Sequence, residues 1–288
     1  MTPALKTDLI ADLERLVRDH YVLEADIDAI AAALYDDSSP LPDSRVDLAG
    51  ELTRRLQITN NDRHMRVRHC PDGPLGDISG DAYEQRWEQE ARTNSGGIEE
   101  VRRITDSSGL MKIAPYTSPV HLARPYVEAA FTLLGHVEHL VIDLREGHGG
   151  TPETIALICS YLLGREPVHL MDVLSRNEPP RHYWTSPMAG RLGDDVRIDV
   201  LTSATTFSGC EELAYNLQAV GRATLIGETT GGGAHPVGAF ALAGDLEATI
   251  PVARARNAIT GTNWEQVGVV PDVPCAATDA LDVALARR

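Results

Sequence analysis

The sequence is poor in lysine and in positive charge. Only Lys6 and Lys112 occur in 288 residues, and 42 acidic side chains outnumber 26 basic ones, which gives a formal net charge of −16. A surplus of negative charge works against electrostatic capture of nucleic acid or of an anionic membrane surface. We therefore expect neither partner, and a small molecule or a peptide fits better. Neither lysine lies near a glycine-rich loop, so a lysine general base is not expected.

Long apolar runs and paired cysteines are missing as well. Charged side chains interrupt residues 1–21, where a signal peptide would need an apolar stretch, and no run approaches membrane-spanning length. The four cysteines, at positions 70, 159, 210 and 275, form no CxxC or Cys/His ligand pattern. We expect a cytoplasmic protein with no disulfide framework, no metal site and no cofactor.

The organisation along the chain changes twice. Apolar residues at helical spacing predict helices within 5–22, 26–36 and 46–59, which together form a small helical unit over residues 1–70. Residues 71–108 are rich in turn residues around one short polar helix, 82–94, and are expected to connect two parts of the chain.

From residue 109 to 288 strand-like and helix-like segments alternate. The runs "HLVIDL" and "DVLT" are continuously apolar, as expected for strands of a sheet that is covered on its faces by helices. This pattern predicts an α/β core, in which strand ends and helix starts meet at one edge and carry the functional site.

Ser208 stands at such a strand-to-helix turn, within "TSATTFSGCEELAYN". A serine at a helix start is near free N–H groups and the helix dipole, which favour a developing negative charge, and Gly209 leaves the next N–H unobstructed. The same spacing, with Glu211 three residues on, is also that of a capping box. The local pattern alone favours the cap over a nucleophile.

Two glycine-rich loops follow other strands. In "LREGHGGTPE", Gly149 and Gly150 could donate N–H groups to an oxyanion, or could simply form a tight turn before a helix. The loop "GETTGGGAHPVG" lacks the lysine of a phosphate-binding loop, so we expect it to approach a substrate closely through Gly232, Gly233 and His235.

A nucleophilic serine needs a base, and ten histidines are available. His64 and His69, in "NDRHMRVRHC", follow the helical unit, but the residue pattern does not say which of them reaches Ser208. Trp184, in the connection "EPPRHYWTSPMAG", either lines a substrate pocket or packs against the edge of the core or a partner subunit, as aromatic residues in connections more often do.

Several ordered motifs together resemble the tail-specific, or C-terminal-processing, serine peptidase family, in the branch of the tricorn core and of interphotoreceptor retinoid-binding protein. They run from "LVRDHYV" through "NDRHMRV" and "LVIDLREGHGG" to "TSATTFSGCEELAYNLQAVGRATLIGETTGGGAHP" and "TGTNWEQVGVVPDV". The resemblance implies an α/β fold with a crotonase-like ββα core. The segment 71–108 is too short for the PDZ module of many members, so we expect that module to be absent.

The resemblance also implies roles for individual residues. Ser208 matches the nucleophile, and Gly209 supplies one N–H of the oxyanion hole, with Gly149 or Gly150 supplying the other. Many members use a lysine in the loop after "GE", but Gly233 stands at the nearest equivalent position, so that dyad is absent. The tricorn-like branch pairs its serine with a histidine and a glutamate, which His64 and Glu265 match.

These observations lead to a serine hydrolase of peptides or related acyl compounds, acting through an acyl-enzyme on Ser208 with His64 as the general base. Two alternatives stay open. The same acyl-serine could serve an acyltransferase or cyclase, or the pocket could bind a small ligand without catalysis. Members of the superfamily often assemble, so a homo-oligomer is a further expectation from the resemblance.

Overall fold

The computed structural model describes residues 2–74, 76 and 80–287, which form two compact units. The first unit comprises Met1–Tyr83, Val173–Pro180 and His235–Arg254, and the second comprises Glu84–Asp172, Arg181–Ala234 and Ala255–Arg288. Each unit is therefore built from segments that are far apart in the sequence.

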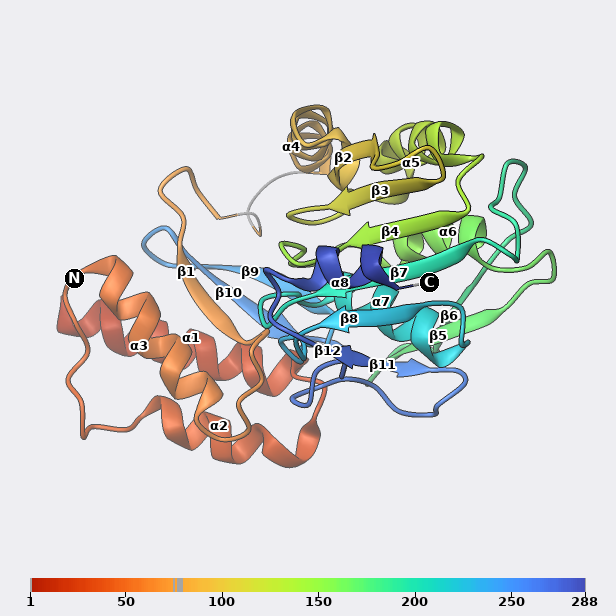
Figure 1. The fold of residues 1–288 in the computed structure, drawn as a ribbon. Coiled ribbons are helices and arrows are strands. Elements are labelled where there is room, and N and C mark those ends of the chain that lie inside the picture. Colours follow the sequence, from red (N-terminus) through yellow and green to blue (C-terminus); the bar gives the residue numbers. More distant parts are fainter. Residues whose placement is uncertain (1, 75, 77–79, 288) are drawn as a thin grey trace. The chain divides into compact units, whose positions relative to one another are not determined.

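The first unit packs helices on a small antiparallel sheet (Figure 1). Its helical elements are α1 (Pro3–His20), η1 (Glu24–Asp26), α2 (Ile27–Leu34) and α3 (Arg45–Gln57). Its sheet has the order β1-β10-β9, with β1 at Arg66–His69, β10 at Leu246–Pro251 and β9 at Val237–Leu242. Leucine and isoleucine side chains from the helices and from β10 form its buried core. The three predicted helices are confirmed.

Local sequence explains where α1 begins. The Thr2 hydroxyl accepts a hydrogen bond from the Leu5 N–H, and Pro3 opens the helix, where its missing N–H costs nothing. Arg18 and His20 lie in the last turn, next to the negative end of the helix dipole. The apolar side chains then fall on one face, toward the core.

The second unit contains a six-stranded sheet in the order β12-β8-β7-β4-β3-β2. Five strands are parallel, and the edge strand β2 runs antiparallel to β3. The strands are β2 (Ile98–Arg103), β3 (Ser108–Ile113), β4 (His139–Asp143), β7 (Arg197–Thr202), β8 (Thr224–Gly227) and β12 (Val273–Pro274). The α/β core is thereby confirmed, although β2 begins within the segment expected to be a connection.

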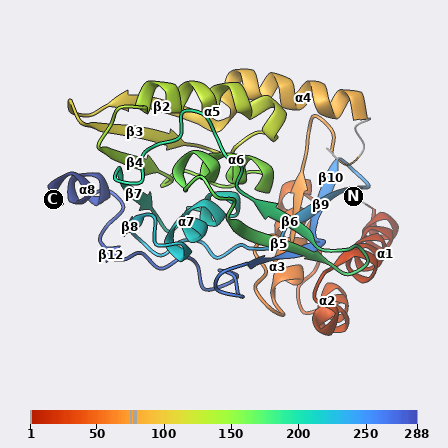
Figure 2. The same cartoon turned by 90° about the vertical axis from the view of Figure 1, so that its right-hand side faces the viewer.

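Helices cover both faces of this sheet (Figure 2). One layer consists of α5 (Val120–Leu134), α6 (Pro152–Leu162) and α7 (Gly209–Ala219), while α8 (Ala280–Ala286) packs on Leu110, Val141, Leu201 and Ile226 from the other side. Because both faces are buried, the central strands are apolar at successive positions, and β4 is buried along its whole length. The polar helix α4 (Gly80–Thr93) and the turn η3 (Ser95–Gly97) precede β2.

A third sheet was not foreseen from the sequence. It has the order β11-β5-β6, with β11 at Ala253–Asn257, β5 at His169–Ser175 and β6 at Arg181–Trp184. Boundaries between the two units fall within β5 and β11. Among the described helices, none has the length and apolar character that a membrane span requires.

Candidate active site

Ser208 is held in a backbone conformation that a serine rarely adopts. Its φ is +53° and its ψ is −124°, immediately before α7 and six residues after the end of β7. A serine that merely caps a helix has an extended backbone with negative φ, and a non-glycine residue with positive φ costs free energy. Such strain persists where the surrounding structure imposes it, and it marks functional turns more often than simple caps.

Hydrogen bonds tie this turn to the loop after β4. The Phe207 N–H donates to the Gly147 carbonyl at 2.9 Å, and the Thr206 hydroxyl donates to the Leu144 carbonyl at 2.8 Å. The Ser203 hydroxyl donates to the Arg145 carbonyl at 2.6 Å. Because β4 and β7 are adjacent parallel strands, both loops leave the same edge of the sheet, and these bonds fix one loop against the other.

Glycines allow the two loops to approach closely beside Ser208. A Cβ on Gly209 would lie 2.7 Å from both the nitrogen and the oxygen of Gly150, and a Cβ on Gly149 would lie 3.7 Å from the Ser208 Cβ. Among the described residues, the N–H groups of Gly150 and Gly209 have no hydrogen-bond acceptor. Two N–H groups without an acceptor, at a helix N-terminus, form a suitable site for an oxyanion.

The Gly149 carbonyl, unlike the N–H groups of Gly150 and Gly209, is hydrogen-bonded within the unit. Its carbonyl accepts hydrogen bonds from the Thr117 N–H at 3.2 Å and from the Cys210 thiol at 3.3 Å. Those bonds fix the peptide that joins Gly149 to Gly150. Of the two glycines predicted as the second donor, Gly150 therefore has the better-defined N–H.

Glu211 joins the nucleophile turn to the third glycine-rich loop. One carboxylate oxygen accepts from the N–H groups of Ser208 and Gly233, both at 2.8 Å. The other accepts from the Gly232 N–H at 2.7 Å and from the Thr230 hydroxyl. Burial raises the pKa of Glu211, and these four hydrogen bonds oppose that rise without cancelling it. The sequence pattern marks Glu211 only as a capping partner, so its contact with the loop was missed.

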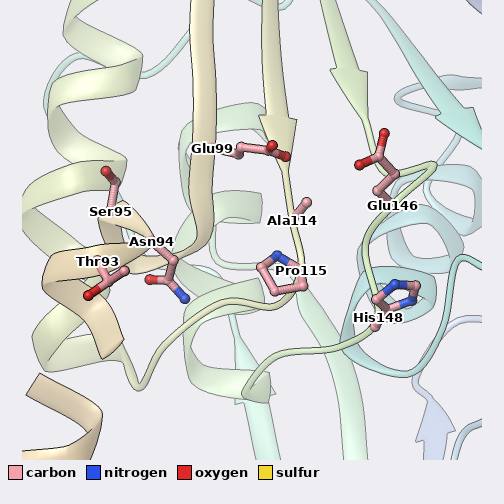
Figure 3. A pocket seen from close by; sticks show the side chains of 8 residues that line it. All are labelled: Thr93, Asn94, Ser95, Glu99, Ala114, Pro115, Glu146 and His148. Carbon is pink, nitrogen blue, oxygen red and sulfur yellow. The ribbon is translucent and has the colours of Figure 1, made fainter. Parts of the chain in front are cut away.

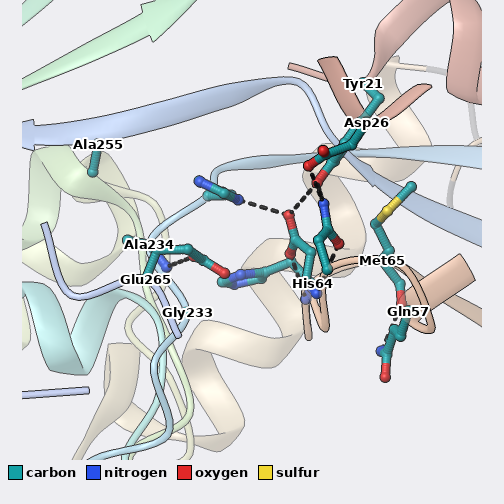
Figure 4. Close-up of polar contacts among 12 residues, drawn as sticks. Tyr21, Asp26, Gln57, His64, Met65, Gly233, Ala234, Ala255 and Glu265 are labelled. Carbon is teal, nitrogen blue, oxygen red and sulfur yellow. Dashed lines mark hydrogen bonds and ion pairs between the residues drawn. The ribbon is translucent and has the colours of Figure 1, made fainter. Parts of the chain in front are cut away.

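The loop that carries Glu265 is hydrogen-bonded to the same glycine-rich loop (Figure 4). Glu265 accepts the Ala234 N–H at 2.6 Å, and the Trp264 indole N–H donates to the Gly233 carbonyl at 2.8 Å. The Gln266 N–H donates to the Gly232 carbonyl at 2.9 Å. The backbone N–H and carbonyl groups of Gly232 and Gly233 are therefore all used inside the unit, and only their Cα atoms are left to contact a substrate.

His64 belongs to the first unit, between α3 and β1. Its backbone N–H donates to the Asp62 carboxylate at 3.1 Å, and its backbone carbonyl accepts a hydrogen bond from the Thr249 hydroxyl at 2.7 Å. Burial lowers the pKa of His64 to about 4, against the opposing charge of Asp62. The imidazole is thus neutral at pH 7, as a general base must be.

Asp62 is fully buried and organises the surroundings of His64. It accepts the Tyr21 hydroxyl at 3.1 Å and lies 2.7 Å from Nδ1 of His235. Burial alone would raise the pKa of Asp62, but the His235 contact and the charges of His235 and His64 hold it below its usual value. His235, predicted to contact substrate, is only 3% exposed and has a partner in Asp62.

The predicted residues thus fall into two groups. Ser208, Glu265, Trp184 and the glycines of all three loops belong to the second unit, whereas His64 and His235 belong to the first. Trp184 lies on β6, is 50% exposed and stacks on His169 at 4.3 Å between ring centroids. The pairing of Ser208 with His64 stays a prediction.

A pocket of about 430 Å³ lies beside the glycine loop of the second unit (Figure 3). It is lined by Thr93, Asn94, Ser95, Glu99, Ala114, Pro115, Glu146 and His148. His148 comes directly before Gly149 and Glu146 three residues before it, so this pocket adjoins the loop that carries the proposed oxyanion donors. It has the size of a site for one or two substrate side chains.

A second serine–histidine contact occurs in the same unit and was not predicted. The Ser108 hydroxyl lies 3.5 Å from Nδ1 of His139, whose Nε2 is 2.9 Å from Asp199. Arg197 donates to the same Nδ1 at 2.7 Å, and a guanidinium can only donate, so that nitrogen is already occupied as an acceptor.

The position of this contact also separates it from the glycine loops. Ser108 and His139 are the first residues of β3 and β4, whereas Ser208 follows the last residue of the parallel strand β7. The two serines therefore lie at opposite edges of the sheet, and only Ser208 lies at the edge where parallel α/β sheets place their sites.

Comparison with known proteins gives a family match and a fold match. The sequence profile of peptidase family S41 matches residues 107–275. A protein from Parabacteroides merdae of known structure shares 17% identity, with a TM-score of 0.66 and coverage of 100% of this chain and 98% of that chain.

Two further structures extend the likeness. The photosystem II D1 C-terminal processing protease has a TM-score of 0.57 and 17% identity, covering 96% of this chain and 94% of that chain. The tricorn protease has a TM-score of 0.61 and 16% identity over 97% of this chain and 35% of its own length. At such identities the likeness concerns the fold, and it confirms the expected crotonase-like α/β fold with N-terminal helices.

Proposed function

The chain belongs to peptidase family S41, and from this premise we propose that it hydrolyses peptide bonds through an acyl-enzyme on Ser208. The observation that carries the proposal is the conformation of Ser208. A strained serine at the N-terminus of α7, beside two N–H groups without acceptors, has the arrangement needed to attack a carbonyl carbon and to stabilise the resulting oxyanion.

In the proposed reaction, His64 takes the proton from the Ser208 hydroxyl as the oxygen attacks the substrate carbonyl. The N–H groups of Gly209 and Gly150 bind the oxyanion of the tetrahedral intermediate. As that intermediate collapses, the C–N bond breaks and His64 returns the proton to the leaving amine. Water then repeats the sequence on the acyl-enzyme and releases the second product. Glu265 is proposed to stabilise the imidazolium that forms in both stages.

The neutral state of His64 at pH 7 supports its role as the base, because an uncharged imidazole can accept a proton. Two other titratable groups of the second unit are poor candidates for the base: Glu211 is engaged by four donors. Lys112 is engaged by Glu99 and Glu146, each at 3.0 Å.

The test is intact-mass analysis after treatment with a fluorophosphonate, which reacts with activated serines. We expect one adduct on the wild-type protein, and no adduct on Ser208→Ala or His64→Ala. Ser108→Ala is the matched control, since it removes the other serine that contacts a histidine, and it should label as the wild type does.

Other results would redirect the assignment. Loss of the adduct in Ser108→Ala alone would move the nucleophile to the opposite edge of the sheet. No adduct on the folded wild-type protein would favour the alternative of a ligand-binding module without catalysis. Retention of the adduct in His64→Ala would leave Ser208 as the nucleophile and remove His64 as its base.

A further inference from the structure

A cluster of two histidines and one aspartate lies within β5 and β6. Nε2 of His169 is 2.8 Å from Oδ1 of Asp172, and Nδ1 of His182 is 2.5 Å from the same oxygen. All three donor atoms lie within 4.8 Å of one another. We propose that His169, Asp172 and His182 bind a divalent cation of the zinc type.

The donor set has the chemistry that such an ion selects. Imidazole nitrogens and a carboxylate oxygen are ordinary zinc ligands, and three protein ligands leave a fourth position open to water. Ligand atoms at 2.0–2.2 Å from a tetrahedral ion are separated from one another by about 3.3 Å. The two contacts to Oδ1 therefore need to lengthen by less than about 1 Å to admit the ion.

Neighbouring residues fix the ligands in the way that outer partners of a metal site do. Arg256 donates to the other oxygen of Asp172 at 2.7 Å, so Oδ1 alone is directed at the histidines. Trp184 stacks on the His169 ring with an interplanar angle of 6°, which holds the ring orientation. Such support makes the ligand geometry persistent rather than accidental.

The three side chains of the cluster differ in solvent exposure, and this difference leaves one side open to an ion. The Asp172 side chain is 5% exposed, that of His169 is 28% exposed, and that of His182 is 54% exposed. The buried carboxylate anchors the site while the open side next to His182 admits the ion and its water. The negative charge of the whole chain, −16, also favours cation binding over long range.

Without an ion, the two rings can donate to Oδ1 only if each carries a proton on the nitrogen that faces it. Zinc would take the place of the proton on each facing nitrogen, so that a neutral ring carries its one proton on the other nitrogen and a charged ring releases one proton. The site would link β5 to β6, so its occupation should stabilise this hairpin.

The proposal is tested by isothermal titration calorimetry of the full chain with ZnCl₂ at pH 7.5. His182→Gln is the informative variant because the half-exposed side chain can be changed with little effect on folding. We expect His182→Gln to bind one zinc ion fewer than the wild type, or to bind it at least about tenfold more weakly. His169→Gln should behave in the same way.

The matched control is His121→Gln, since His121 is an exposed histidine in the same unit with its own carboxylate partner, Glu84. This variant should bind zinc as the wild type does. A second readout is the melting temperature, which 100 μM ZnCl₂ should raise in the wild type and in His121→Gln but not in His182→Gln. Equal zinc stoichiometry and affinity in His182→Gln and the wild type, or no zinc binding by the wild type, would overturn the proposal.

Discussion

Ser208 should stay reactive at pH values at which a solvent-exposed histidine is already protonated and no longer acts as a base. Burial lowers the pKa of His64 to about 4, and Arg66, His235 and Arg63 act in the same direction while Asp62 opposes them. An unperturbed histidine titrates near pH 6.5. The acid limb of the reaction should therefore lie more than about two pH units lower than in a serine hydrolase with an exposed histidine.

The size of the effect follows from these two values. A shift from about 6.5 to about 4 corresponds to about 3 kcal/mol in favour of the neutral imidazole. At pH 5.5 a histidine with the ordinary pKa is about 10% neutral, whereas His64 with a pKa of about 4 is more than about 95% neutral. The labelling rate at pH 5.5 should thus stay close to its value at pH 7.5 instead of falling about tenfold.

The assay is the second-order rate of fluorophosphonate labelling from pH 4 to pH 8, followed by intact mass, because it requires no known substrate. Circular dichroism at each pH separates titration of the base from unfolding. An acid limb with its midpoint near pH 6.5 in a chain that is still folded would refute the reasoning, since it would show that His64 is not the base or is not buried when Ser208 reacts.

The same shift makes folding depend on pH. The pKa of His64 is lower in the folded chain than in the unfolded one, so the unfolded chain binds more protons between about pH 4 and pH 6.5. The stability that comes from keeping the imidazole neutral is complete above about pH 6.5 and declines as the pH falls toward 4. Urea unfolding at pH 7 and pH 5 should show this loss, and His64→Gln should reduce it.

Three changes in the second unit, and a glycine control in the first, supply further tests. Gly209→Ala should abolish labelling, because the new Cβ would lie 2.7 Å from backbone atoms of the neighbouring loop. Gly50 lies on the exposed face of α3, and a Cβ there would meet no atom within 4 Å. Gly50→Ala should therefore raise the free energy of unfolding by about 0.5–1 kcal/mol, measured by chemical unfolding. Glu211→Gln should slow labelling at least about tenfold, since an amide cannot accept all four hydrogen bonds; unchanged kinetics would show that Glu211 does not position the nucleophile. If peptide libraries show cleavage, Glu99→Gln with Glu146→Gln should weaken any preference for lysine or arginine, and an unchanged preference would exclude the pocket as its source.

The parts of the fold that the sequence predicts are those with strong local signals. Helices α1 and α6 and strands β4 and β7 have either clear helical periodicity or continuously apolar runs. Strands β9 and β10 carry mixed patterns of small, polar and apolar residues. The pairing of β10 with β1 joins positions such as Val67 and Ala248, which no local pattern can indicate.

The site shows the same limit. The order of motifs indicates Ser208, because a serine and glycine between a buried strand and an apolar helix are visible in the sequence. The positive φ of Ser208 and the contact of Glu211 with Gly232 and Gly233 depend on three loops that meet only in the folded chain. Spacing alone therefore favoured a capping residue, and the backbone conformation supplies the argument for a nucleophile.

The loop after β8 gives the last reason to seek the base outside the second unit. Gly233, the position at which the resemblance would place a lysine, has its N–H and carbonyl both bonded, to Glu211 and Trp264. The one lysine of this unit, Lys112, pairs with two glutamates, and these partners raise its pKa despite partial burial, so it is a poor proton acceptor. Neither position offers a good base for Ser208, which is consistent with the proposal that the neutral, buried His64 takes this role.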